Sequence, residues 1–326
     1  MRIALTLVLI GLLISGCGGA SGADRPNEDA TLLLDFAPNA VHAGIYLATA
    51  RGYDEAEGVS LEVRRPGAST DALKQLQTGR ADFAILDIHD LGLARERGRD
   101  VVGVYAIVQR PLAAVIARPG IERPSDLEGR RAGVTGLPSD DAVLRSVVAD
   151  DGGDPDKVRA TTIGFEAVKA LLAGRVDAAT AFWNAEGVAL ERRRPGFKEF
   201  RVDDFGAPSY PELVLCVTRT TLEDRRPLVR AAIRGLQRGY LQAQAEPDSA
   251  VGAVLEEARG SDRAEIAAQL DAVSPAFTAG ARAPGELRAE VLRDWAAWDE
   301  RFGILSKPLD VQGAFDLDQV GPVRNP

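Results

Sequence analysis

Short apolar runs alternate with segments of helical periodicity along the first 182 residues of this chain. Strands are expected at 31–36, 59–64, 81–86, 101–108, 131–134, 158–163 and 176–182, and helices at 43–51, 70–78, 89–97, 140–150 and 166–173. Such alternation predicts parallel sheets covered by helices, an α/β fold. Beyond residue 220 the pattern changes, and amphipathic helices are expected at 227–245, 249–259, 263–273 and 285–302, separated by prolines.

One short segment occurs twice in similar form. Residues 76–82 read LQTGRAD and residues 171–177 read LLAGRVD, and an apolar strand follows each of them. In both, a glycine (Gly79 or Gly174) can end the helix in the left-handed conformation. The repeat therefore predicts two lobes of similar design, each a mostly parallel sheet flanked by helices. Because ligands bind beyond the carboxyl ends of parallel strands, residues 87–89 and 182–184 are expected to face one cleft.

The boundaries of the lobes follow from two short, strongly apolar segments, 112–117 and 213–217. They lie where the chain would cross between lobes, and we interpret them as hinge strands. The first lobe would then comprise residues 30–112 and 218–326, including the C-terminal helices, and the second lobe residues 118–212. Both segments could instead be ordinary core strands, and the sequence leaves that alternative open.

The N-terminus has the form of a secretory signal. Arg2 is followed by an uncharged apolar run over residues 3–14, too short to span a bilayer as a stable helix. Small residues then precede Cys17, as in a bacterial lipobox. We predict a lipoprotein signal peptide at 1–16, a lipidated Cys17, and a flexible tether at 17–29 that holds the protein outside the cytoplasmic membrane. The alternative is an ordinary cleaved signal with an incidental cysteine.

Composition indicates a globular body and narrows the range of partners. The chain has 326 residues, 45% of them hydrophobic, and a formal net charge of −9. This balance argues against nucleic acid or an anionic lipid surface as a partner. With Cys17 lipidated, Cys216 has no disulfide partner, and its apolar surroundings predict a buried, inert thiol. We expect a monomer with no cofactor and no metal.

Several motifs, taken in order, carry a family resemblance. They are LDFAPNAVHAGIY at 34–46, RGY at 51–53, EGV at 57–59, GRADF at 79–83, GGDPDKV at 152–158 and GRVDA at 174–178. These motifs resemble those of type II periplasmic binding proteins, and most closely the branch that takes up pyrimidine precursors of thiamine, such as formylaminopyrimidine. The wider family includes binders of sulfonate, nitrate and riboflavin. Phe36 and Ala37 stand where the pyrimidine branch often has tryptophan and threonine.

The resemblance implies a two-lobed type II periplasmic-binding-protein fold and a solute-binding lipoprotein, with ABC permease and ATPase subunits as partners. It implies binding rather than enzymatic activity. Fungal relatives that synthesise the thiamine pyrimidine use a histidine and a cysteine-rich motif. His42 could match that histidine, but the sequence has no cysteine cluster. A pyrimidine-synthase-like enzyme is therefore the alternative from another class.

A small planar ligand needs aromatic faces for stacking and a few polar groups for orientation. The candidates for stacking are Trp183, Phe36 and Tyr210, although each could instead pack in the core. The candidates for hydrogen bonding are Asn39, His42, Asp87, His89, Asn184 and Glu186. The two histidines could alternatively form a metal-ligand pair.

A further wall of the cleft is expected around Leu137 and Ser139, with Ser139 as the N-cap of the following helix. Asp140 and Asp141 would occupy the first turn of that helix and repel an anion. This favours a neutral or cationic heterocycle as the ligand.

Overall fold

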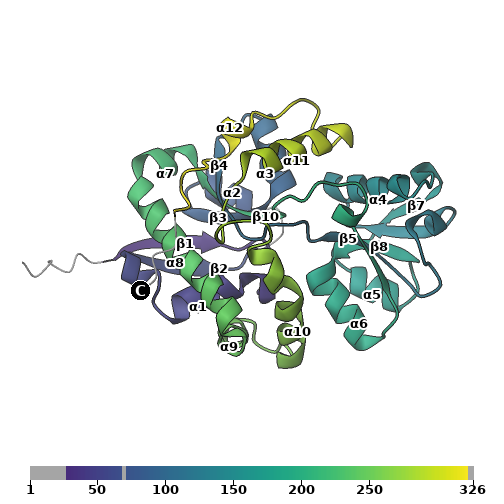
Figure 1. The fold of residues 1–326 in the computed structure, drawn as a ribbon, viewed down its shortest axis with the longest axis horizontal. Coiled ribbons are helices and arrows are strands. Elements are labelled where there is room, and N and C mark those ends of the chain that lie inside the picture. Colours follow the sequence, from purple (N-terminus) through teal and green to yellow (C-terminus); the bar gives the residue numbers. More distant parts are fainter. Residues whose placement is uncertain (1–26, 68–70, 322–326) are drawn as a thin grey trace, which may run out of the picture.

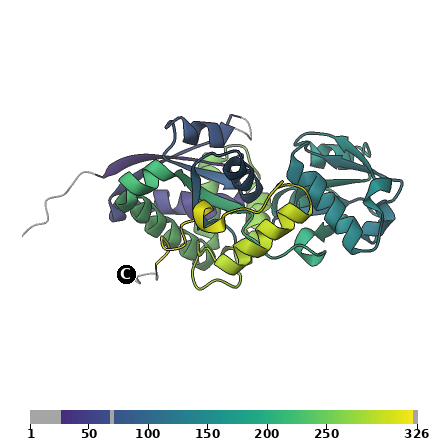
Figure 2. The same ribbon diagram turned by 90° about the horizontal axis from the view of Figure 1, so that it is seen from above.

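The computed structural model describes residues 27–67 and 71–321, and within these ranges the chain forms two five-stranded sheets. One sheet has the strand order β2-β1-β3-β10-β4 and the other β7-β6-β8-β5-β9. Figure 1 shows the sheets in two lobes side by side, and Figure 2 shows the same separation from above. The predicted two-lobed α/β architecture is confirmed.

The first lobe contains the strands β1 (Glu28–Leu33), β2 (Val59–Arg64), β3 (Phe83–Asp87), β4 (Val101–Ala106) and β10 (Leu213–Thr218). Its early helices are α1 (Ala43–Ala50), α2 (Asp71–Gln77) and α3 (Ile88–Glu96). Strands β1, β2 and β3 are parallel, and β10 runs antiparallel to both β3 and β4. Strand β1 ends three residues earlier than the sequence predicted, and Asp35 and Phe36 leave the sheet toward the second lobe.

The second lobe repeats this plan. Its strands are β5 (Ala113–Ala117), β6 (Arg131–Val134), β7 (Arg159–Thr162), β8 (Ala178–Phe182) and β9 (Lys198–Arg201), and its helices are α4 (Pro138–Asp150), α5 (Ala167–Leu172) and α6 (Val188–Arg193). Strands β6, β7 and β8 are parallel, and β5 runs antiparallel to β8 and β9. Each sheet therefore has one antiparallel strand in the same place, fourth in its order.

The C-terminal helices return to the first lobe. They are α7 (Arg219–Asp224), α8 (Arg226–Ala245), α9 (Pro247–Glu257), α10 (Arg263–Val273), α11 (Ala289–Arg301) and α12 (Val311–Ala314). Helices α8 and α9 pack on α1, while α11 and α12 lie near α3 on the other face of the sheet (Figure 1). Helix α10 also reaches the second lobe, where it contacts α6.

The central strands are buried on both faces, which explains why they read as continuous apolar runs. In β10, Leu213, Leu215 and Val217 pack into one hydrophobic cluster, whereas Val214 and Cys216 pack into another on the opposite face. Cys216 is free and buried, as predicted, and burial raises the pKa of its thiol. Both clusters continue into the second lobe through β5.

The repeated segment has the same structure in both lobes. Gly79 and Gly174 adopt φ values of +67° and +68° after α2 and α5. The carboxylate of Asp82 accepts the backbone N–H of Thr31 at 2.8 Å, and that of Asp177 accepts the N–H of Arg131 at 3.0 Å. In each lobe, therefore, an aspartate joins the start of the third parallel strand to the strand beside it.

The chain passes between the sheets twice, at residues 107–112 (the first crossing) and 202–212 (the second crossing). The segments interpreted as hinge strands coincide with β5 and β10, each paired on both sides within its sheet. Their bending during lobe motion stays a prediction.

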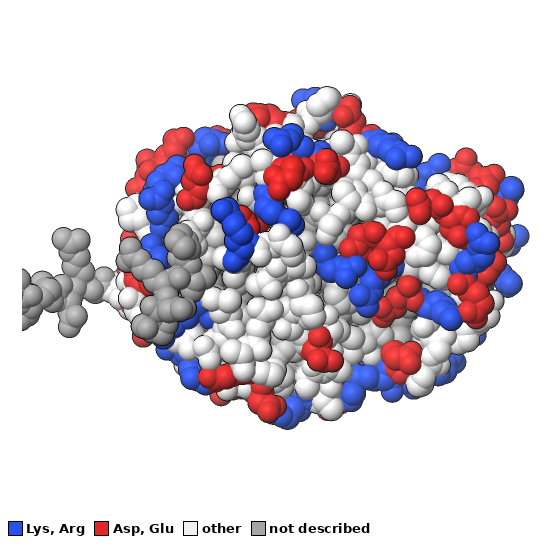
Figure 3. All heavy atoms as spheres, viewed as in Figure 1, with Lys and Arg blue, Asp and Glu red and all other residues white. Residues whose placement is uncertain are grey.

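The predicted signal peptide and Cys17 lie outside the described residues, and the end of the predicted tether overlaps β1, which begins at Glu28. In the described part of the chain, no helix is long and apolar enough to cross a membrane. On the face seen in Figure 3, basic and acidic side chains are interspersed over both lobes.

Candidate ligand-binding cleft

A cleft with a volume of about 140 Å³ lies between the two lobes. It is formed where the chain leaves the carboxyl ends of strands in each lobe, and these segments are called strand exits below. The first lobe contributes the ends of β1 and β3, and the second contributes the segments after β6, β7 and β8. The predicted residues that line it are Phe36, Asn39, Asp87, His89, Leu137, Ser139, Asn184 and Glu186. The structure thus brings together residues that are up to 150 positions apart in the sequence.

The predicted residues His42, Trp183 and Tyr210 do not line the cleft but lie behind its walls. Trp183 is 2% exposed, and its indole N–H donates to the carbonyl oxygen of Pro111 at 2.9 Å. The guanidinium of Arg201 lies 4.1 Å from the centre of its ring. The ring therefore anchors the first crossing to the second lobe, which differs from the stacking role proposed from the sequence.

His42 supports the first lobe's wall from behind. Its Nε2 lies 2.8 Å from Oδ1 of Asp35, and its Nδ1 accepts the backbone N–H of Asn39 at 3.3 Å. These contacts suit the tautomer that carries its proton on Nε2. The side chain of Asn39 accepts the N–H of Val41 at 2.9 Å and so begins the helical turn before α1. These contacts thus position Asp35, which faces the cleft.

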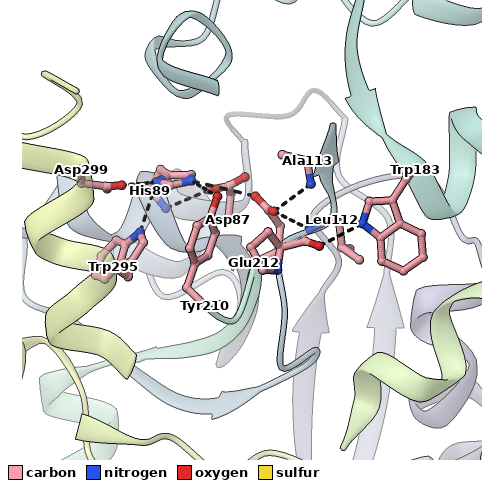
Figure 4. A network of polar contacts seen from close by, with 10 residues as sticks. Asp87, His89, Leu112, Ala113, Trp183, Tyr210, Glu212, Trp295 and Asp299 are labelled. Atoms are coloured by element: carbon pink, nitrogen blue, oxygen red, sulfur yellow. Dashed lines mark hydrogen bonds and ion pairs between the residues drawn. The ribbon is translucent and has the colours of Figure 1, made fainter. Parts of the chain in front are cut away.

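A buried charged network forms the floor of the cleft at the exit of β3 (Figure 4). Nδ1 of His89 lies 2.9 Å from Oδ2 of Asp299 on α11, and its Nε2 lies 3.2 Å from the hydroxyl of Tyr210. Burial alone would lower the pKa of His89, but the carboxylates of Asp299 and Asp87 outweigh this and raise it to about 10. His89 is therefore an imidazolium at neutral pH, and it partly compensates the carboxylates around it.

Asp87 and Glu212 meet beside this imidazolium. Burial raises the pKa of both carboxyl groups. Ligand atoms of Asp87, His89 and Glu212 lie within 4.8 Å of one another, and these residues are the one group in the described chain that could hold a metal ion. A metal would have to displace the proton on Nε2 of His89, because imidazole binds metals in its neutral form.

The second lobe's wall is formed after β8. Asn184 is 1% exposed, and its Oδ1 has no hydrogen-bond partner within the described protein. Glu186 accepts the N–H of Phe182 at 3.2 Å, and burial raises its pKa. Buried polar atoms are nearly always satisfied. The free Oδ1 of Asn184 is therefore a ready acceptor for a donor in the cleft.

The start of α4 completes this wall, but not as the sequence predicted. The helix begins at Pro138 with Leu137 as its N-cap, so Ser139 lies inside the first turn and the predicted N-cap role is wrong. Instead, Asp140 folds back and accepts the N–H of Thr135 at 2.6 Å. Asp140 occupies the first turn and lines the cleft, as expected.

Two exposed aromatic rings face each other across the cleft. Phe36 of the first lobe and Phe165 of the second are 41% and 52% exposed, and their ring centroids are 5.8 Å apart. Phe165 was not predicted as a site residue, although it follows Gly164 just beyond the carboxyl end of β7. Other lining residues that were missed as ligand contacts are Asp35, Asp90, Thr135, Asp140 and Glu212.

The lining of the cleft is strongly acidic. Six carboxyl groups face it, from Asp35, Asp87, Asp90, Asp140, Glu186 and Glu212, and no lysine or arginine is among its lining residues. His89 is the one cationic group in the lining, and Asp299 pairs with it from behind. The arrangement suits a ligand that is rich in hydrogen-bond donors or positively charged, and it disfavours anions.

The chain is similar in sequence to known binding proteins and to a synthase. A formylaminopyrimidine-binding protein of Halalkalibacterium halodurans is 30% identical over 255 residues, which cover 77% of each chain. A riboflavin-binding protein of Chloroflexus aurantiacus is 26% identical over 348 residues, covering 97% of this chain and 96% of the relative. A 4-amino-5-hydroxymethyl-2-methylpyrimidine phosphate synthase of Legionella pneumophila is 24% identical over 225 residues, covering 68% and 71%.

The architecture also matches solved structures. The aliphatic sulphonate-binding protein SsuA of Escherichia coli superposes with a TM-score of 0.73 at 15% identity, covering 92% of this chain and 96% of that one. The fold is therefore that of the periplasmic binding proteins, as the sequence resemblance implied. A profile of the NMT1/THI5-like family matches residues 39–250, which include most of both cleft walls, and the chain belongs to this family.

Proposed function

We propose that this protein is the extracytoplasmic solute-binding lipoprotein of an ABC importer and that it binds a thiamine pyrimidine precursor of the formylaminopyrimidine or hydroxymethylpyrimidine type. The observation that carries the proposal is the acceptor-rich cleft between the two lobes, with six carboxyl groups, an amide oxygen without a partner among the described residues, and two facing phenylalanines. An aminopyrimidine presents a flat aromatic face and N–H donors, which match these groups. The 30% identical relative is itself named for formylaminopyrimidine.

In the proposed mode of binding, the pyrimidine packs beside Phe36 and Phe165, one from each lobe, whose ring centroids are 5.8 Å apart and thus too close to hold a third ring between them. Its exocyclic amino group donates to Oδ1 of Asn184 and to the carboxyl group of Glu186. Because the ligand contacts both lobes, binding favours their closure by a hinge motion, and the closed form is the one that docks on the permease.

Other ligands of the family fit less well. Sulfonate and nitrate are anions, and the cleft offers them carboxylates without a lysine or arginine. Riboflavin is neutral and remains the second candidate, because a relative that covers nearly the whole chain is named for it. The enzyme alternative lacks its cysteine-rich motif, since Cys216 is the one cysteine in the described chain and is buried in β10.

Titration calorimetry with formylaminopyrimidine, hydroxymethylpyrimidine, riboflavin, an alkanesulfonate and nitrate tests the ligand class. We expect a pyrimidine to bind and N184A to weaken its binding at least tenfold, a loss of about 1.4 kcal/mol. Q269A is the matched control, because Gln269 also has a buried, unpartnered amide oxygen but lies on α10 outside the cleft lining. Binding of nitrate or sulfonate in preference to pyrimidines would refute the assignment.

The proposed membrane anchor rests on the sequence before Cys17. Metabolic labelling with palmitate in a bacterial host tests it. We expect the wild-type protein to be labelled and held in the membrane fraction, and C17S to be unlabelled. Equal labelling of both proteins would contradict lipidation at this cysteine.

A further inference from the structure

Glu212 is the last residue of the second crossing, and its side chain reaches the first crossing. The residue is 1% exposed. Its Oε2 accepts the backbone N–H of Leu112 at 2.7 Å and that of Ala113 at 3.0 Å (Figure 4). These two amides stand where the first crossing enters β5. One buried carboxylate therefore joins the two segments that connect the lobes.

The same residue also touches the floor of the cleft. Its backbone oxygen accepts the N–H of Ile88 at 2.9 Å, where β3 ends and α3 begins. A carboxyl oxygen of Glu212 lies within 4.8 Å of one of Asp87, and its Oε1 lies 4.0 Å from Nε2 of His89. Both Glu212 and Asp87 line the cleft. Arg110 and Asp203 form a second link between the crossings, at 2.8 Å, but neither lines the cleft.

We propose that Glu212 is a positioning residue that ties the two crossings together and couples occupation of the cleft to the angle between the lobes. This inference rests on the proposed ligand-binding function. Lobe rotation changes backbone dihedral angles in the crossings. If one crossing moved alone, two buried N–H groups would lose their acceptor, so the crossings move as a pair. A hydrogen-bond donor of the ligand that approaches Asp87 and Glu212 would change the interactions of the carboxyl group that holds the two crossings together.

Three substitutions separate the reach of the side chain from its charge. E212Q keeps an oxygen within reach of both amides but removes the charge, E212D keeps the charge but shortens the reach, and E212A removes both. We expect hydrogen exchange at Leu112 and Ala113 to be roughly tenfold or more faster in E212D and E212A than in the wild type, and slower in E212Q than in E212D. Small-angle scattering without ligand should show a larger radius of gyration for E212D and E212A.

With formylaminopyrimidine added, the wild type should become more compact, and E212D and E212A should show a smaller change at matched occupancy. D54A is the control, because Asp54 is also a buried carboxyl group that accepts a backbone N–H, from Leu61 of β2 at 2.9 Å, but it does not line the cleft. We expect D54A to lower stability without changing the radius of gyration or its response to ligand.

The proposal is overturned if E212D and E212A behave like the wild type in exchange and scattering, or if D54A changes the scattering as much as they do. If E212A does not fold, E212D and E212Q carry the same comparison. If the wild type binds no pyrimidine, the proposed function fails on its own, and the ligand-free measurements still decide whether Glu212 ties the crossings.

Discussion

The exits of β3 and β8 occupy equivalent places in the two lobes, yet their side chains do different things. The repeat aligns Asp87 with Phe182, Ile88 with Trp183 and His89 with Asn184. In each exit, the first and third residues line the cleft and the second is buried behind it. The backbone therefore follows the same path in both lobes, because a glycine turn and an aspartate hydrogen bond precede each strand.

The difference lies in how each exit satisfies its polar groups. In the first lobe, His89 is paired with Asp299 and contacts Tyr210, so its polar groups are satisfied within the protein. In the second lobe, Oδ1 of Asn184 has no partner among the described residues. We infer that the first exit supports the fold and sets the charge of the cleft, whereas the second provides the open positions for a ligand.

The largest expected effect comes from replacing His89. H89A removes the cation from a buried group of carboxylates, and we expect the free energy of unfolding to fall by about 3–5 kcal/mol. The equivalent change in the other lobe, N184A, removes an atom without a partner and should cost less than about 1 kcal/mol. Urea unfolding of both variants measures the contrast. Equal losses would show that the two exits do not differ in this way.

The next effect is a dependence of stability on pH. The pKa of His89 is about 10 in the folded protein and 6.5 in its unperturbed state, so the folded state holds a proton that the unfolded chain releases between these values. Its contribution is complete below pH 6.5 and is lost as the pH rises through about 10. Stability should therefore fall with rising pH, by at most about 1.4 kcal/mol per unit.

Urea unfolding at pH 6.5, 7.5 and 8.5 measures this slope. The raised pKa values of Asp87, Glu212 and Glu186 act in the same direction, because the folded state also holds their protons longer. H89Q should flatten the slope, and N184A should retain it. A slope that is the same in the wild type and in H89Q would assign the effect to the carboxyl groups alone.

A smaller effect, equal in sign in both lobes, is expected for the repeated aspartates. D82A and D177A each remove a hydrogen bond from a carboxylate to a neighbouring strand, and each should cost about 1–2 kcal/mol. D82A should cost more, because Asp82 also accepts a hydrogen bond from Arg225, whereas Nε of Arg131 lies 3.8 Å from the carboxylate of Asp177. D248A is the control, since that side chain is 99% exposed. Chemical unfolding measures both variants. If only one of them lost stability, the two aspartates would not play the same role in their lobes.

The smallest effect concerns the buried middle residue of each exit. W183F keeps an aromatic ring but removes the N–H that donates to Pro111, and it should cost about 1 kcal/mol. I88V in the other lobe should cost a similar amount by removing one buried methyl group. Neither should change the affinity for a pyrimidine. A large loss of affinity in W183F would restore the stacking role that the sequence suggested.

Much of the fold could be predicted from the sequence because its signals are local. The strands at 59–64 and 131–134 and the helix at 263–273 agree with the structure at both ends. Strand β9 and helices α7 and α12, each four to six residues long, were missed. The sequence also could not tell that β5 and β10 pair antiparallel on both sides, because pairing depends on strands distant in the chain.

The sequence by itself determined the two-lobed plan, the family and most of the cleft. Alternating periodicity and a repeated turn are encoded by neighbouring residues, and strand exits can be read from them. Only the tertiary structure decided which of these residues line the cleft. It buried Trp183, brought Phe165 opposite Phe36, and gathered Glu212 and Asp299 around His89, because these contacts join segments up to 210 residues apart.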